Sequence, residues 1–314
     1  MAERCPVETR FVDWLLSRIP ADPRLEIAGG DDAAVLRPPP QRRTVVTVDM
    51  LTEGVDFLFG PDCLPGAVGH KSLAVSLSDL AAMAARPEAA FVAVALPRTR
   101  AEEIGRGLFD GLERLARDQG VVIAGGDTNT WDGPLVISVT AIGSVAPGAA
   151  WRRDGAQVGD LLVVTGPCGG SLLGRHLAVR PRCLESLDIA GRFRVNAAID
   201  ISDGLSLDLT RLMKASRTQG VVDLQHIPVH PDAVRQSSQD GLSPLDHALS
   251  DGEDFELLLA MPAADAQGLV INPPAGLRPI VIGEVVAGNG LVARDQTGLL
   301  RPLEPKGWLH DGTG

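Results

Sequence analysis

Apolar and polar positions along this chain follow two periods, one typical of helices and one typical of strands. In residues 8–19, for example, Phe11, Leu15 and Leu16 fall on one side of a helix. In the first half of the chain the pattern predicts helices over 8–19, 65–85 and 101–118, and strands over 43–51, 89–97, 121–127 and 134–145. This order of elements predicts a sheet with helices on one face.

The composition changes near Pro147, where a stretch rich in Gly, Ala and charged residues separates two halves. We therefore predict one domain over 1–147 and a second over 148–314. In the second half the pattern predicts strands over 161–166, 197–202, 220–224, 255–261 and 278–286, a helix over 205–216, and a loose loop over 236–244.

The overall composition is that of an ordinary globular protein. With 314 residues, 45% of them hydrophobic, the chain is long enough for two domains with cores of their own. No apolar run has the length of a membrane span, and the charged start MAERCPVETR is not a signal segment, so we expect a cytoplasmic protein without a membrane partner. A formal net charge of -11 argues against a nucleic-acid partner. The cysteines and histidines lack the spacing of a zinc site.

Aspartates recur at predicted strand ends and helix starts, beside Gly, Ser or Thr. They are Asp31, Asp32, Asp49, Asp79, Asp127, Asp200 and Asp203. Each alone could form a turn or cap a helix, as Asp203 could for the helix that starts at Leu205. Asp79, however, lies inside an apolar helical run, where an unpaired carboxylate is costly to bury. Because the chain has only three lysines, a divalent metal is the simplest partner, and oxygen ligands suit Mg²⁺ shared with substrate phosphates.

Two glycine-containing stretches bear on phosphate binding. In AGGDTNT, Gly125 and Gly126 follow a predicted strand, where the missing side chains let backbone N–H groups approach a phosphate. The turn TGPCGGSLLG is a weaker candidate, because glycine in such a turn often serves packing alone. That turn matches neither a Walker A loop nor a clear dinucleotide fingerprint. The residues favour a nucleotide enzyme outside those two classes.

An ordered series of stretches resembles the thiamine-monophosphate kinase family: GGDDAAVL, VTVDMLTEGVDF, HKSLAVSLSDLAAMAARP, IAGGDT, RRDGAQVGD, VTGPCGGS, AIDISDGLSLDL, DGEDFEL and KGW. The resemblance extends over residues 29–308. The third and seventh stretches are specific to a wider superfamily that includes aminoimidazole ribonucleotide synthetase and selenophosphate synthetase. The stretch DGEDFEL and the series as a whole favour the kinase.

The resemblance implies an α+β fold of the two-domain aminoimidazole ribonucleotide synthetase-like type, in which each domain is a mixed β-sheet with helices on one face. It implies that the first domain binds ATP and Mg²⁺ and forms a homodimer through its sheet, and that the second completes the nucleotide and substrate cleft. The implied reaction is direct in-line transfer of the γ-phosphoryl group of ATP to thiamine monophosphate, which gives thiamine diphosphate.

The resemblance also assigns roles to residues that match its motifs. Implied metal ligands, for several Mg²⁺ ions, are Asp32, Thr47, Asp49, Asp79, Asp127, Asp200 and Asp203. Implied ATP contacts are Gly126, Asp127, Arg153 and Ser202, and implied substrate contacts are Glu253 and Trp308. No catalytic base is implied, because the acceptor is already an anion.

Two of these residues have a plain alternative. Arg153 could supply a cation to the ATP phosphates, or it could be a surface arginine of the linker. Trp308 could stack on a thiamine ring, or it could belong to a terminal core.

Some positions depart from the family pattern. Asp56 stands where the family usually has a histidine that contacts the substrate, and Val48 replaces a threonine beside Asp49. Asp251 replaces the first glycine of a usual G-G-E-D, and Asp31 has no matching role. These changes concern the substrate side more than the nucleotide side.

Two other functions stay open at this point. One is a sister ATP-using synthetase of the same superfamily, which is disfavoured because no selenium-type cysteine motif is present. The other is a non-catalytic protein that binds Mg²⁺ and nucleotide, which would bind without turnover.

Overall fold

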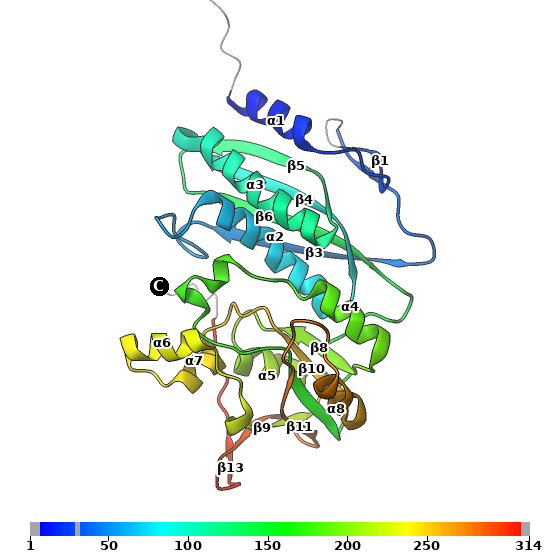
Figure 1. Ribbon diagram of the computed structural model, residues 1–314, viewed down its shortest axis with the longest axis vertical. Coiled ribbons are helices and arrows are strands. Elements are labelled where there is room, and N and C mark those ends of the chain that lie inside the picture. The colour runs from blue at the N-terminus through cyan, green and yellow to red at the C-terminus, as the bar shows by residue number, and fades with distance from the viewer. Residues whose placement is uncertain (1–6, 29–31, 309–314) are drawn as a thin grey trace, which may run out of the picture. The chain divides into compact units, whose positions relative to one another are not determined.

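The computed structural model describes residues 7–28 and 32–308. Asp31, one of the two adjacent aspartates, lies outside the described residues. The chain divides into two compact units (Figure 1). The N-terminal unit comprises the residues up to Leu80, Ala85–Gly148 and Leu177–Val179, and the C-terminal unit comprises Ala81–Ala84, Ala149–His176 and the chain from Arg180 onward.

A four-stranded sheet in the order β3-β6-β4-β5 forms the centre of the N-terminal unit. Its strands are β3 (Arg43–Thr52), β4 (Arg86–Pro97), β5 (Val122–Trp131) and β6 (Val136–Val145), and only β4 and β5 pair in parallel. The helices of this unit are α1 (Val7–Arg18), α2 (Pro65–Ala82) and α3 (Ala101–Gln119), with η1 (Arg98–Arg100) and the short strands β1 (Leu25–Ile27) and β2 (Val35–Leu36). In Figure 1, α2 and α3 lie side by side along the sheet.

Glycines let α2 and α3 approach each other backbone to backbone. A Cβ at Gly69 would lie 2.0 Å from the Leu108 carbonyl oxygen, and one at Gly111 would lie 1.9 Å from that of Gly66. Ile104, Leu108, Leu112 and Leu115 of α3 are all buried, at helical spacing, which explains the strong apolar pattern of this segment.

The two faces of β3 differ. Val46, Val48 and Met50 are 57%, 61% and 63% exposed on one face. Thr47 and Asp49 point to the other face, since Asp49 contacts Ser76 of α2. The helices therefore cover one face of the N-terminal sheet, and we call the opposite one the open face.

The C-terminal unit is built on a seven-stranded mixed sheet in the order β13-β12-β9-β11-β7-β10-β8. Its strands are β7 (Asp160–Val164), β8 (Ala197–Asp200), β9 (Gln219–Asp223), β10 (Leu257–Pro262), β11 (Ile280–Val286), β12 (Gly290–Arg294) and β13 (Leu300–Pro302). Its helices are α4 (Cys183–Arg192), α5 (Leu205–Ser216), α6 (Pro231–Asp240), α7 (Pro244–Ser250) and α8 (Ala263–Ile271), with 3-10 turns η2 (Ser171–Leu173), η3 (Arg175–Leu177) and η4 (Leu224–His226). The apolar face of α5, with Leu205, Leu209 and Leu212, packs into the main core.

The prediction of a loose loop over 236–244 is wrong for its first half. Residues up to Asp240 belong to α6, which begins at Pro231. The His230 side chain caps its start, since Nδ1 accepts a hydrogen bond from the Asp232 amide (3.0 Å), and the left-handed Gly241 caps its end. Pro231 and Gly241, which mark the two ends, are visible in the sequence. The residues between them are mostly polar, so no apolar helical pattern indicated the helix.

Within residues 7–28 and 32–308, no helix combines the length and the apolar composition that crossing a membrane requires.

Candidate functional site

The N-terminal unit brings two of the predicted aspartates together beneath its sheet. Asp49 of β3 accepts a hydrogen bond from the Ser76 hydroxyl of α2 (2.6 Å), and the Thr47 hydroxyl donates to Asp79. Burial raises the pKa of Asp49 to about 6; the Ser76 bond opposes that rise and the nearby Asp79 adds to it. We call these four residues the α2 carboxylate cluster.

Asp49 lies three residues before the end of β3, not at or just past it as the sequence suggested, because the pairing of β3 with β6 continues to Thr52. Its position inside the strand is what turns its carboxylate toward α2. In the described part of the chain, neither Asp49 nor Asp79 forms an ion pair with an arginine or lysine.

The donors of the α2 carboxylate cluster suit a hard cation. They are carboxylate and hydroxyl oxygens, with no nitrogen or sulfur among them, which is the set that Mg²⁺ prefers. Across the described ranges, no three His, Cys, Asp or Glu side chains gather closely enough to hold a metal by themselves. Mg²⁺ usually takes one or two protein carboxylates and completes its shell with waters and substrate phosphate oxygens, so a two-carboxylate cluster fits that ion.

Asp127 and Gly126 lie within a strand. Because β5 continues to Trp131, Gly125 and Gly126 lie inside the strand and do not follow it. A Cβ at Gly126 would lie 1.8 Å from the Val92 carbonyl oxygen, so the close pairing of β4 and β5 itself requires glycine there. Packing thus accounts for this residue without a phosphate.

The strand register places Asp127 on the open face. Asp127 pairs with Ala93, Ala93 with Ser138, and Ser138 with Met50, which is exposed on that face. Asp49 is on the other side, so the structure does not bring Asp127 to the α2 carboxylate cluster of the same chain.

Asp32 borders a cavity of about 780 Å³ in the N-terminal unit. Gly126 and Asp127 line the same cavity, so three of the predicted residues surround one space. Most of the remaining wall is apolar and includes Phe11 and Leu15 of α1. The cavity offers carboxylates at an otherwise hydrophobic surface.

In the C-terminal unit, hydrogen bonds join three segments that carry predicted site residues. The Glu253 amide donates to the Ser202 carbonyl (2.7 Å), and the Trp308 amide donates to the Asp203 carbonyl (2.9 Å). Asp200 is buried at the end of β8, opposite Leu257 of β10. These five predicted residues, Asp200, Ser202, Asp203, Glu253 and Trp308, are therefore brought together.

Asp203 has a cation within the protein. Arg211 of α5 forms an ion pair with Asp203 and another with Asp208 (2.7 Å). Asp208 in turn accepts the amides of Ser202 (3.1 Å) and Asp203 (2.9 Å), and burial raises its pKa despite those bonds. The Asp203 side chain does not cap α5. Sequence reasoning missed Arg211, although its spacing of three from Asp208 on a helix was a usable signal.

The structure also bears on the two residues with plain alternatives. Trp308 is 57% exposed, so its ring is not part of a core. The carbonyl of Arg153 accepts the Ser216 hydroxyl (2.8 Å) at the end of α5, whereas Asp203 precedes the start of α5. The main chain at Arg153 is thus at the opposite end of that helix.

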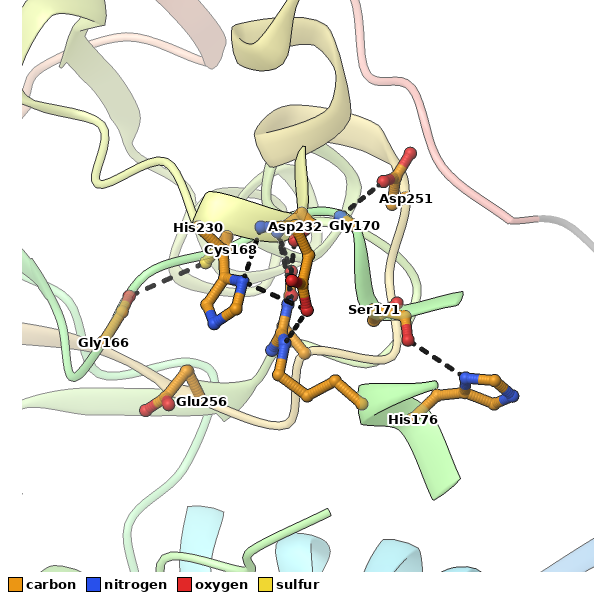
Figure 2. Close-up of polar contacts among 12 residues, drawn as sticks. Gly166, Cys168, Gly170, Ser171, His176, His230, Asp232, Asp251 and Glu256 are labelled. Atoms are coloured by element: carbon orange, nitrogen blue, oxygen red, sulfur yellow. Dashed lines mark hydrogen bonds and ion pairs between the residues drawn. The ribbon is translucent and has the colours of Figure 1, made fainter. Parts of the chain in front are cut away.

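In the glycine-rich turn at 166–171, two backbone amides donate hydrogen bonds to carboxylates of the protein itself. Gly169 donates to Asp254 (2.9 Å) and Gly170 donates to Asp251 (2.7 Å), as Figure 2 shows for the second pair. Because protein carboxylates already accept these N–H groups, the turn serves packing in this structure and does not offer the amides to a phosphate.

Buried carboxylates behind this turn are paired with arginines. The Asp254 carboxylate accepts a hydrogen bond from Arg175 (2.9 Å). The Glu256 carboxylate accepts hydrogen bonds from Arg182 and from the Thr165 hydroxyl (2.6 Å). Burial raises the pKa of Asp254 to about 7, against the opposing effect of Arg175 and the Gly169 amide. The sequence did not single out these pairs, since their partners are about 80 positions apart.

Asp56, at the position of the family's substrate histidine, closes its own turn. Its carboxylate accepts the Thr52 amide (2.7 Å), and its carbonyl accepts the ammonium group of the buried Lys71 (2.8 Å). The Asp56 side chain therefore stabilises the loop that follows β3.

Comparisons with known proteins agree with this architecture. Residues 30–145 match the AIR synthase related protein, N-terminal domain, and residues 157–296 match the AIR synthase related protein, C-terminal domain. The thiamine-monophosphate kinase of Rhodopirellula baltica is 40% identical over 314 residues, which cover 98% of each chain. That of Escherichia coli K12 is 33% identical and covers 92% of this chain and 93% of its own.

Solved structures give the same picture. The thiamine-monophosphate kinase from Stenotrophomonas maltophilia K279a is 32% identical, with a TM-score of 0.77 over 93% of this chain and 96% of that chain. AaThiL complexed with AMPPCP and TMP is 27% identical, with a TM-score of 0.76 over 96% of this chain and 95% of that chain. The predicted fold class, two domains of mixed sheets and helices, is confirmed. The chain belongs to the thiamine-monophosphate kinase family, within the AIR synthase related proteins.

Proposed function

We infer that this chain is a kinase that transfers the γ-phosphoryl group of ATP to thiamine monophosphate and so produces thiamine diphosphate and ADP. The observation that carries this inference is the 40% identity, over nearly the whole of both chains, to a thiamine-monophosphate kinase. A structural relative that is complexed with AMPPCP and TMP supports the same pair of substrates.

We propose Mg²⁺ as the metal of this reaction. Bound Mg²⁺ would offset charge on the ATP oxygens and on the transferring group. As its ligands we propose, in the N-terminal unit, Asp32, Thr47, Asp49, Asp79 and Asp127, and in the C-terminal unit, Asp200 and Asp203. The α2 carboxylate cluster supports this most directly, because its two carboxylates have hydroxyl partners and, within residues 7–28 and 32–308, no ion pair with an arginine or lysine.

The remaining predicted residues would hold the two substrates. Gly126, Arg153 and Ser202 are proposed contacts of ATP, and Glu253 and Trp308 of thiamine monophosphate. The exposed indole of Trp308 suits stacking on an aromatic ring. The Glu253 carboxylate suits a cationic substrate, because opposite charges attract over short distances. No side chain has to remove a proton, since the acceptor phosphate is already an anion.

A homodimer is part of the proposal. The open face exposes Val46, Val48 and Met50 together, and a contiguous apolar surface of this kind is typical of an interface. The division of roles between residues 1–147 and 148–314 and a cytoplasmic location stay predictions.

The test is a direct assay of purified protein with ATP, Mg²⁺ and thiamine monophosphate, in which thiamine diphosphate and ADP are quantified. We expect both products in equal amounts and little ADP without the acceptor. ADP formed only with other phosphorylated acceptors would favour a sister enzyme of the superfamily. Binding of ATP without turnover for any acceptor would favour a non-catalytic nucleotide-binding protein.

A further inference from the structure

A short segment of the C-terminal unit has an unusual backbone. Gly252, Glu253 and Phe255 all have positive φ angles, of 74°, 51° and 51°. Side chains other than glycine rarely adopt this region, and they stay in it only where the surroundings hold them there. A Cβ at Gly252 would also lie 2.7 Å from the Ser202 carbonyl oxygen, so the segment is tightly pressed against residues 202–203. Something must hold residues 252–255 in this conformation.

The glycine-rich turn supplies that support, residue by residue. The Gly169 amide donates to Asp254, the Gly170 amide to Asp251 (2.7 Å), and the Ser171 hydroxyl to the Gly252 carbonyl (2.7 Å). Figure 2 shows the Asp251 carboxylate directed at Gly170. Three consecutive residues of one turn therefore bind the two carboxylates that flank Glu253 and the carbonyl just before it.

Asp251 lies beside a buried histidine. This aspartate follows the last residue of α7, where the helix carbonyls carry partial negative charge and disfavour an acid. The buried His247 faces Asp251 with Nδ1 (2.9 Å) and Asp240 with Nε2 (3.2 Å). Burial lowers the pKa of His247, but the hydrogen bonds to Asp251 and Asp240 outweigh this effect, so the pKa lies above its usual value. His247 thus holds the Asp251 carboxylate in place, directed at Gly170.

We propose that Asp251, held by His247, is a positioning residue that fixes Glu253 for the substrate through the turn at 169–171. This deepens the proposed function, since it rests on Glu253 as a contact of thiamine monophosphate. It also gives a role to the aspartate that departs from the family's G-G-E-D pattern: its carboxylate faces the protein's own turn. Asp254 is the matching residue on the other side of Glu253.

The first test is amide hydrogen exchange of residues 252–255 in the full chain, which needs no activity. Asp251 has a helical φ of -66°, so alanine fits its backbone. We expect Asp251→Ala to speed the exchange of the Glu253 and Phe255 amides about tenfold, because a hydrogen bond to a charged group is lost. Asp240→Ala is the matched control, since it removes a carboxylate from the same His247 without touching the turn, and it should leave exchange within about twofold.

The second test is steady-state kinetics of the same variants. Asp251→Ala should raise KM for thiamine monophosphate about tenfold and leave KM for ATP and kcat within about twofold, whereas Asp251→Asn, which keeps an acceptor for Gly170, should recover most of the affinity. Wild-type exchange rates in both Asp251 variants would overturn the proposal. So would faster exchange with an unchanged KM for thiamine monophosphate. If the wild-type chain forms no thiamine diphosphate, the proposed function fails, while the exchange experiment still decides whether the turn holds the segment.

Discussion

Two groups of half-buried and buried carboxylates in this molecule differ in what neutralises them. In the C-terminal unit, Asp254 is paired with Arg175 and Glu256 with Arg182. In the N-terminal unit, Asp49 and Asp79 have hydroxyl partners, and among the described residues no arginine or lysine pairs with either. Asp254 and Glu256, each buried and paired with an arginine, hold the fold together. Under the proposed function, the carboxylates of Asp49 and Asp79 would instead bind a cation from outside the protein.

The largest loss of stability should come from removing an arginine that is paired with a buried carboxylate. We expect Arg182→Met to lower the free energy of unfolding by about 3–5 kcal/mol, because Glu256 is left buried without its cation. Urea unfolding measures this. The double variant Arg182→Met with Glu256→Met should regain most of the loss, and Arg100→Met, at an exposed pair, should change little. Equal, small losses in all three would show that the arginine pairs are not what stabilises this region.

Breaking the α2 carboxylate cluster should give the opposite result, with activity lost and the fold kept. Asp79→Asn keeps an acceptor for the Thr47 hydroxyl and removes the charge that opposes Asp49. We expect thiamine diphosphate formation to fall roughly 100-fold or more, with a melting temperature that is unchanged or higher. Asp118→Asn, on the exposed surface of α3, is the charge-matched control. A variant that unfolds as readily as Arg182→Met would place Asp79 with the structural carboxylates.

A smaller effect is the dependence of stability on pH that Asp254 of the C-terminal unit should cause. Because burial raises the pKa of Asp254 from 3.8 to about 7, its favourable contribution is complete below pH 3.8 and is lost as the pH rises through about 7. The charged groups that face Asp254 are Arg175, which opposes the rise, and Glu256, which adds to it. Between pH 6 and pH 8 the wild type should lose about 1 kcal/mol of stability relative to Asp254→Asn. Parallel stability curves for the two proteins would contradict this account of Asp254.

The sequence predicted the bounds of those elements that have a strong apolar pattern and residues typical of helix or strand ends. The helix predicted over 205–216 is α5 to the residue, and α3 differs from its prediction by one residue at its end. The predicted family and function were reached through whole motifs, whose order along the chain is itself specific.

What the sequence did not reveal depends on distant partners. That β5 runs on beyond Asp127 to Trp131 depends on its pairing with β4. That Asp49 turns toward α2 depends on how far the pairing with β6 extends. Asp251 is a departure from the family pattern, and only the fold shows that its partners are Gly170 and His247. Local pattern contains no information on such pairings.

The most direct test of the central claim is the rate of thiamine diphosphate formation from ATP and thiamine monophosphate as a function of Mg²⁺ concentration, compared between wild type and Asp79→Asn. We expect a wild-type rate that is zero without Mg²⁺ and saturates as Mg²⁺ is added. The Asp79→Asn variant should need far more Mg²⁺ and stay slow at saturation. Identical Mg²⁺ curves for the two proteins would contradict that claim.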